Sequence, residues 1–152
     1  MPVCMFERAS KSWVKIVDKP LRGRSILVVE DDSVLATDLT ALLTQAGCKV
    51  VLPTTSVAAA LSTMVHYVID AAILDVNVQN EWVFPVAHAL AAAGVPFVFL
   101  TAYALDSIPP EHRERPFLRK PHVPAELLAA VTDMLAPVAA NDEGSAARPR
   151  SA

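Results

Sequence analysis

The amino-acid sequence predicts a doubly wound α/β fold, in which helices flank a five-stranded parallel sheet. Five short apolar segments alternate with longer segments of helical spacing, a pattern typical of parallel α/β sheets. The apolar segments are hydrophobic almost throughout rather than at every second position, which indicates that both sheet faces are covered. With 152 residues, 53% of them hydrophobic and 19% charged, the chain can bury one core and is not disordered throughout.

The strands are predicted where short, mainly apolar and β-branched runs occur. They lie at residues 26–29, 49–52, 71–74, 96–100 and 117–119. The helices are predicted where apolar side chains recur every three or four residues. They lie at residues 33–46, from Thr55 or Ser56 to about Tyr67, at 82–93 and at 125–135.

The ends of these elements follow from single residues. Gly47 ends the first helix, because glycine adopts the left-handed conformation that closes many helices. We expect Pro53 to end the second strand. Thr55 or Ser56 can accept hydrogen bonds from the first turn of the second helix. Pro124 favours the start of the last helix, since proline is well tolerated in a first turn.

The segment between the fourth and fifth strands lacks the sequence pattern of a regular helix. Residues 103–115 contain a Pro-Pro pair and little apolar periodicity, so we expect this fourth helix to be short or disordered. We divide the chain into an N-terminal extension, residues 1–23, one domain, residues 24–137, and a disordered C-terminal tail, residues 138–152.

Charge, cysteine and glycine content exclude several classes of protein. The net charge of −3 is a poor match for a nucleic-acid-binding protein. No uncharged apolar run reaches the roughly 18 residues of a membrane-spanning helix. Cys4 and Cys48 make neither a zinc-binding pattern nor a disulfide framework, and no glycine-rich loop of a dinucleotide enzyme follows the first strand. We expect a cytoplasmic protein that binds neither nucleic acid nor a membrane.

Polar side chains follow four of the five predicted strands. They are Glu30, Asp31 and Asp32 after the first strand, Asp75 after the third, Thr101 after the fourth and Lys120 after the fifth. The carboxyl ends of parallel strands meet at one edge of the sheet, where ligands bind in folds of this kind. Crowded carboxylates repel one another unless a cation is present, and Mg²⁺ prefers oxygen ligands. We therefore expect a Mg²⁺ site at this edge.

This set of side chains is suited to phosphoryl transfer. With Mg²⁺ bound, Asp75 could attack a phosphoryl group, while Thr101 and Lys120 hold the phosphoryl oxygens. Taken singly, each residue has an ordinary structural interpretation; Asp32 or Ser33, for example, is well placed to cap the helix that follows. The four histidines lack metal-site spacing, and we interpret them as surface or helix residues. They are His66, His88, His112 and His122.

The sequence around these residues resembles the receiver domain of two-component response regulators. The resemblance covers about Arg24 to Pro137 and rests on four motifs in order. They are Ile26-Leu27-Val28-Val29-Glu30-Asp31-Asp32, Ile73-Leu74-Asp75-Val76-Asn77, Leu100-Thr101-Ala102 and Leu118-Arg119-Lys120-Pro121. It implies the flavodoxin-like receiver fold.

The resemblance also implies a role for each matching residue. Asp75 would accept a phosphoryl group from a histidine kinase or a phosphotransfer protein. Thr101 would sense the phosphoryl oxygen, Lys120 would pair with its charge, and Phe117 would be the aromatic residue that swings inward on activation. The implied ligands of Mg²⁺ are Glu30, Asp31, Asp75 and the backbone carbonyl of Asn77.

Two departures from the family pattern affect these expectations. The loop after Asp75 lacks the usual Pro and Asp-Gly, so Glu81 or Trp82 is expected at the site entrance. The segment around Thr101 partly matches a subgroup of stand-alone bacterial receivers that carries a Phe-Ala-Thr-Gly-x-Tyr motif and a mobile fourth helix, but Tyr103 lies one place early. Activation through ordering of residues 103–115 is therefore an alternative to the usual threonine–aromatic switch.

The leading hypothesis is a single-domain response regulator that signals by protein contact, because only about fifteen residues follow the domain. We expect the kinase to dock beside the first helix, near Leu35. The unknown downstream protein would contact the last helix, the fifth strand and residues 103–115, and a homodimer is left open. The alternative is a receiver-like binding module that works without phosphorylation. A phosphatase is disfavoured because Asn77 stands where a second acid is needed, so we expect no enzyme activity beyond the domain's own phosphorylation and dephosphorylation.

Overall fold

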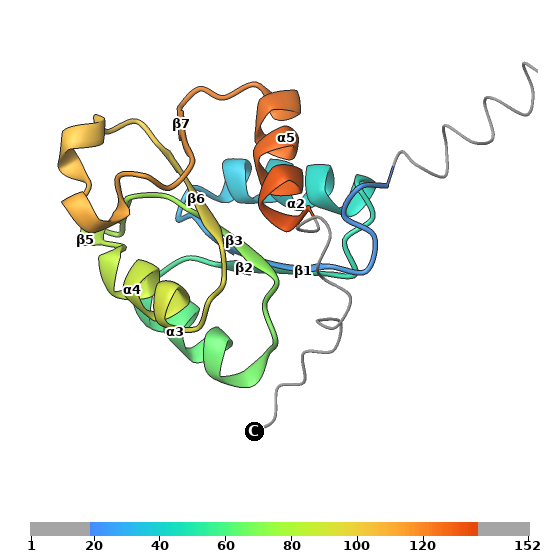
Figure 1. Ribbon diagram of the computed structural model, residues 1–152, viewed down its shortest axis with the longest axis horizontal. Helices are drawn as coiled ribbons and strands as arrows, with labels where there is room; N and C mark the ends of the chain where they lie inside the picture. Colours follow the sequence, from blue (N-terminus) through green and yellow to red (C-terminus); the bar gives the residue numbers. More distant parts are fainter. Residues whose placement is uncertain (1–18, 137–152) are drawn as a thin grey trace, which may run out of the picture.

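A five-stranded parallel sheet in the order β2-β1-β3-β6-β7 forms the centre of the computed structural model, which describes residues 19–136 (Figure 1). Its strands are β1 (Ser25–Val29), β2 (Val50–Thr54), β3 (Ala71–Leu74), β6 (Phe97–Thr101) and β7 (Phe117–Arg119). The α-helices are α2 (Ser33–Gln45), α3 (Val57–His66), α4 (Phe84–Ala92) and α5 (Pro124–Leu135). The predicted fold class is confirmed.

Helices cover both faces of the sheet, with α2 and α5 on one side and α3 and α4 on the other (Figure 1). Successive residues of a strand point to opposite faces, so β1 contributes to two cores. Leu27 and Val29 pack in the core under α3 and α4, whereas Ile26 and Val28 pack in the core under α2 and α5. All four side chains are at most 1% exposed, as expected for a strand covered on both faces.

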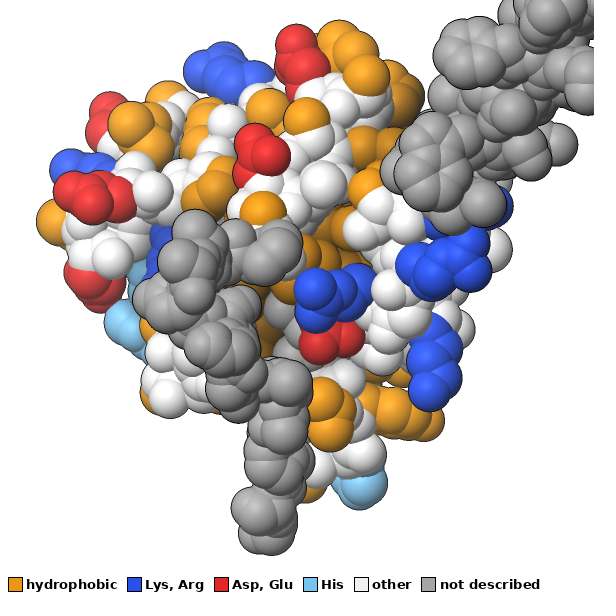
Figure 2. All heavy atoms as spheres, turned by 45° about the vertical axis from the view of Figure 1, so that its right-hand side comes forward, with side chains coloured by type: hydrophobic (Ala, Val, Ile, Leu, Met, Phe, Trp, Pro, Cys, Tyr) orange, Lys and Arg blue, Asp and Glu red, His pale blue; other side chains and the backbone are white. Residues whose placement is uncertain are grey.

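Side-chain caps explain where two of the helices begin. Asp32 Oδ1 accepts hydrogen bonds from the backbone N–H groups of Val34 and Leu35, at 2.9 and 3.1 Å, and so starts α2. Ser56 rather than Thr55 caps α3, and its hydroxyl accepts from the Ala59 N–H at 3.0 Å. Acidic, basic and apolar side chains are interspersed on the face shown in Figure 2.

The structure corrects two predicted element boundaries. Strand β2 does not end at Pro53 but continues to Thr54, with Pro53 opposite Val28; β2 is an edge strand, where the missing N–H of proline is tolerated. The helix predicted from Trp82 begins at Phe84 instead. Trp82 belongs to a two-stranded hairpin of β4 (Asn77–Val78) and β5 (Glu81–Trp82).

The hairpin turn uses a backbone conformation that is uncommon outside glycine. Gln79 and Asn80 have φ values of 53° and 62°. Two successive residues of positive φ are typical of the tight type I′ turn, whose twist matches that of paired strands. Because the turn leads into β5, Trp82 is a strand residue, and α4 begins two residues later than the periodicity predicted.

The region between β6 and β7 holds only two short 3₁₀ turns, η1 (Leu105–Ser107) and η2 (Pro110–His112). A short or disordered fourth helix was expected here, and the two 3₁₀ turns agree with the first of these alternatives. His112 was expected to be a surface or helix residue. It lies in the 3₁₀ helix η2, which agrees with the second alternative, but it is only 3% exposed and is therefore not a surface residue. Burial, followed by the nearby His88, lowers the pKa of this imidazole.

The predicted terminal segments lie largely outside the described residues, which exclude 1–18 and 137–152. Of the stretch placed in the N-terminal extension, residues 19–23 are described, and they pack against the domain. Leu21 is fully buried in the core under α2 and α5, and its N–H donates to the Ala46 carbonyl at 3.0 Å. Within residues 19–136, no helix has the length and apolar character needed to cross a membrane.

Candidate functional site

Backbone hydrogen bonds hold three of the candidate residues just beyond the strands. The Glu30 N–H donates to the Thr54 carbonyl, the Asp75 N–H to the Val29 carbonyl and the Lys120 N–H to the Thr101 carbonyl, each at 3.0 Å. These bonds extend the strand pairing by one step, so the side chains project from one rigid edge. The arrangement follows from four strand ends meeting there, as the sequence predicts.

The Lys120 ammonium joins the two buried carboxylates of the site. Its Nζ donates to Glu30 Oε1 at 2.8 Å and to Asp75 Oδ2 at 3.0 Å. The side chains of Lys120, Glu30 and Asp75 are 18%, 3% and 10% exposed. Charge-assisted hydrogen bonds at this depth are stronger than those at an open surface.

Burial and mutual attraction shift the pKa values in this group. Burial raises the pKa of Glu30, the Lys120 hydrogen bond lowers it and the Asp75 charge raises it, so the pKa lies above its ordinary value. For Lys120, burial alone would lower the pKa, but hydrogen bonds to Glu30 and Asp75 outweigh it and the pKa is raised. Lys120 therefore remains a cation at neutral pH.

Asp31 adds a third carboxylate from the solvent side. Glu30, Asp31 and Asp75 each offer a carboxylate oxygen, and these oxygens lie within 4.8 Å of one another. Asp31 is exposed, and its Oδ2 accepts from the Gln79 N–H at 2.7 Å, so the β4–β5 hairpin orients it. A donor set made only of carboxylate oxygens fits Mg²⁺, a hard cation that prefers oxygen.

Asp32 and the Asn77 carbonyl were also expected at this edge of the sheet. Asp32 caps α2 and is not part of the carboxylate cluster. Asn77 begins β4, two residues beyond Asp75. Its backbone carbonyl as a metal ligand stays a prediction.

Thr101 links the site to the segment that follows β6. Thr101 is fully buried, and its Oγ1 accepts from the Tyr103 N–H at 3.1 Å. Tyr103 is 42% exposed, and its ring packs edge-on against Trp82, with ring centroids 5.6 Å apart. Trp82 stacks in turn on Phe84, at 5.7 Å.

This row of three aromatic rings was not foreseen. Glu81 or Trp82 was expected near the site entrance, and both residues lie in β5 of a hairpin that the sequence did not predict. Phe117, the expected switch residue, is half-buried and packs against the core under α3 and α4. Its movement stays a prediction.

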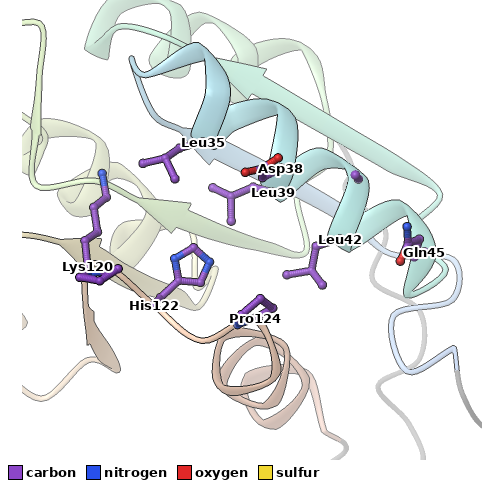
Figure 3. A pocket seen from close by; sticks show the side chains of 10 residues that line it. Leu35, Asp38, Leu39, Leu42, Gln45, Lys120, His122 and Pro124 are labelled. Atoms are coloured by element: carbon purple, nitrogen blue, oxygen red, sulfur yellow. The ribbon is translucent and has the colours of Figure 1, made fainter.

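A groove of about 690 Å³ runs between α2 and the start of α5, beside the acidic site (Figure 3). Leu35, Leu39 and Leu42 of α2 form one wall, and His122 and Pro124 face them across the groove (Figure 3). Lys120 also lines it, while its ammonium points away toward the carboxylates. A mainly apolar groove with few polar groups is typical of a binding surface.

Comparisons with known proteins agree with this geometry. Residues 26–132 match the family of the response regulator receiver domain. The solution structure of SdrG from Sphingomonas melonis Fr1 is 38% identical, covers 77% of this chain and 98% of that chain, and has a TM-score of 0.64. The BeF3-activated conformation of SdrG from Pseudomonas melonis Fr1 is 40% identical, covers 71% and 95%, and has a TM-score of 0.60.

A further solved structure is more distant in sequence. A response regulator receiver protein from Sinorhizobium medicae WSM419 is 26% identical, covers 76% of this chain and 96% of that chain, and has a TM-score of 0.65. No curated protein matches the chain.

Proposed function

Because the chain belongs to the response regulator receiver domain family, we propose that it accepts a phosphoryl group on Asp75 and passes the signal on by protein contact. The donor would be a histidine kinase or a phosphotransfer protein, and the reaction would depend on Mg²⁺ bound by Glu30, Asp31 and Asp75. The observation that carries the proposal is the Lys120 ammonium, held within 3.0 Å of Asp75 at the edge where the three carboxylates meet.

In the proposed transfer, an Asp75 carboxylate oxygen attacks the phosphorus of a phosphohistidine. A P–O bond forms as the P–N bond breaks, and the electron pair and a proton go to the departing imidazole. Lys120 Nζ contacts Asp75 Oδ2, which leaves the other carboxylate oxygen for the attack. When bound, Mg²⁺ would supply positive charge to the phosphoryl oxygens.

Two residues of the chain would respond to the new charge. The Lys120 ammonium would exchange part of its contact with Glu30 for a phosphoryl oxygen. The Thr101 hydroxyl accepts from Tyr103, so its proton is free to be donated to another phosphoryl oxygen. A shift of Thr101 would act directly on the Tyr103 backbone, and through it on the segment that carries η1 and η2.

Support for a receiver that changes shape on activation comes from a related protein. The 40% identical SdrG structure is described as a BeF3-activated conformation, and we propose a comparable activated state here. We also propose that the kinase docks in the groove between α2 and α5, since Lys120 lines the groove and reaches the site. We further propose that the protein is a stand-alone receiver in the cytoplasm and is related to the Phe-Ala-Thr-Gly-x-Tyr subgroup.

The direct test is intact-mass spectrometry after incubation with a small-molecule phosphodonor and Mg²⁺. Wild type should gain one phosphoryl group, whereas Asp75→Asn and wild type with chelator should gain none. Asp133→Asn is the matched control, because Asp133 is an exposed carboxylate on α5 that belongs neither to the carboxylate cluster nor to the lining of the groove. If neither small donors nor phosphorylated kinases modify the wild type, the alternative of a phosphorylation-independent binding module is favoured.

A further inference from the structure

A second group of metal-binding side chains lies outside the acidic site. His88 projects from α4, while Glu111 and His112 belong to η2. His88 Nε2 lies 3.6 Å from Glu111 Oε2, and one ligand atom of each of the three residues lies within 4.8 Å of the others. The two imidazole rings are 4.9 Å apart between centroids. Residues 23 positions apart in the chain thus converge on one point of the surface.

His112 carries the second, independent observation. His112 is only 3% exposed. Neither Nδ1 nor Nε2 of its ring has a hydrogen-bond partner among residues 19–136. The rings of Phe97 and Phe99 pack against the His112 ring, with centroids 5.7 and 6.3 Å from its own. These phenyl rings offer no conventional hydrogen-bond donor or acceptor to the imidazole nitrogens. Buried polar atoms almost always have a partner, so an orphaned imidazole points to a ligand.

The donor set identifies the class of that ligand. Two imidazole nitrogens and one carboxylate suit a borderline transition metal such as Zn²⁺ and do not suit Mg²⁺. Tetrahedral Zn²⁺ with bonds of about 2.0–2.2 Å sets its ligand atoms roughly 3.4 Å apart. The 3.6 Å between His88 Nε2 and Glu111 Oε2 is close to that spacing, and a His112 nitrogen lies within 4.8 Å of both atoms.

The surroundings allow an ion to enter and the site to close. His88 and Glu111 have side chains that are 57% and 54% exposed, so one side of the cluster is open to solvent. Glu111 and His112 lie in a single 3₁₀ turn, which adjusts more easily than a long helix. Three protein ligands leave the fourth position of the metal to water.

We propose that His88, Glu111 and His112 form a Zn²⁺ site that ties η2 to α4. The ion would satisfy the buried His112 ring and hold the segment between β6 and β7 against the core under α3 and α4. The site is separate from the phosphoacceptor residues, so it does not depend on the proposed function.

The test is a competition titration of the full chain with Zn²⁺ and a chromophoric chelator, in excess Mg²⁺. We expect one Zn²⁺ per chain, and at least tenfold weaker binding for His88→Ala and for Glu111→Gln, since even outer partners of a metal site contribute about that much. Both residues are exposed, so these variants should fold. His66→Ala is the matched control, because His66 is exposed on α3, away from the cluster, where its Nδ1 lies 2.9 Å from the Ser62 carbonyl oxygen. The Zn²⁺ affinity of this variant should equal that of the wild type.

Two further measurements separate this site from the acidic one. The imidazole NMR signals of His88 and His112 should shift on addition of Zn²⁺, while that of His66 stays in place. Asp31→Asn should leave Zn²⁺ affinity unchanged. The proposal is overturned if the chain binds no Zn²⁺ at micromolar concentration, if His88→Ala and Glu111→Gln bind it as the wild type does, or if Asp31→Asn alone abolishes binding. Phosphoryl uptake on Asp75 would stand or fall separately.

Discussion

Replacing Lys120 with Met removes the cation that pairs with Glu30 and Asp75, at 2.8 and 3.0 Å. A hydrogen bond to a charged group contributes about 1.5–3 kcal/mol to the free energy of unfolding. Loss of both bonds would therefore lower the free energy of unfolding by about 3–6 kcal/mol. The buried carboxylates can escape part of this cost, because one of them can take up a proton.

Protonation of Glu30 limits how much stability Lys120→Met can lose, because a neutral Glu30 no longer needs a cationic partner. Glu30 has an ordinary pKa of 4.5, and protonating it at pH 7 costs about 3.4 kcal/mol at 1.36 kcal/mol per pH unit. At pH 5.5 the same step costs about 1.4 kcal/mol. We therefore expect Lys120→Met to lower the free energy of unfolding by about 3 kcal/mol at pH 7, and by roughly half of that or less at pH 5.5.

The assay is urea unfolding of metal-free protein followed by circular dichroism, with Lys49→Met as the control because Lys49 is exposed. The control should stay within about 0.5 kcal/mol of wild type. Added Mg²⁺ should reduce the loss in Lys120→Met, since it supplies the missing positive charge. A loss below about 1 kcal/mol at pH 7, or one that is equal at the two pH values, would refute the reasoning.

Three further predictions concern other parts of the molecule. Gly47→Ala should destabilise the fold by about 2 kcal/mol in urea unfolding, since φ is +102° and a Cβ would lie 3.0 Å from Lys19 Cβ; Gly94→Ala, with open space around it, should cost less. Burial raises the pKa of the Cys48 thiol from 9.0 to about 11, so in a Cys4→Ser background its alkylation at pH 8 should be about 100-fold slower than in denaturant, and equal rates would contradict this. In metal-free protein, NMR titration should place the Glu30 pKa above 4.5 and higher still in Lys120→Met. Because the folded pKa is the higher one, Glu30 stabilises the fold fully below pH 4.5, and this contribution is lost as pH rises through the folded pKa.

The sheet and the acidic site could be predicted from local sequence, because each depends on short runs that carry their own signal. Five apolar segments identify the strands, and the residue directly after a strand such as β3 must lie at its carboxyl end. The positions of Glu30, Asp75 and Lys120 follow from this rule alone. Whether Lys120 contacts one carboxylate or both depends on side-chain packing, which no sequence pattern specifies.

The β4–β5 hairpin and the cluster of His88, Glu111 and His112 could not be predicted in the same way. Gln79 and Asn80 form a type I′ turn without glycine, the residue that usually marks such turns, so helical periodicity was extended too far toward Trp82. His112 lies in a segment with no periodicity, and its burial depends on how the β6–β7 connection folds over Phe97 and Phe99. Metal-site spacing in sequence misses ligands that come from separate elements.

The most direct test of the central claim is to locate the phosphoryl group on the chain. Wild type would be phosphorylated in Mg²⁺, reduced with borohydride to convert an aspartyl phosphate into homoserine, digested and mapped by tandem mass spectrometry. We expect homoserine at position 75 and at no other acidic residue of the site. Homoserine at Asp31 or Asp32 instead, or phosphorylation that persists in Asp75→Asn, would contradict the assignment of Asp75 as the phosphoacceptor.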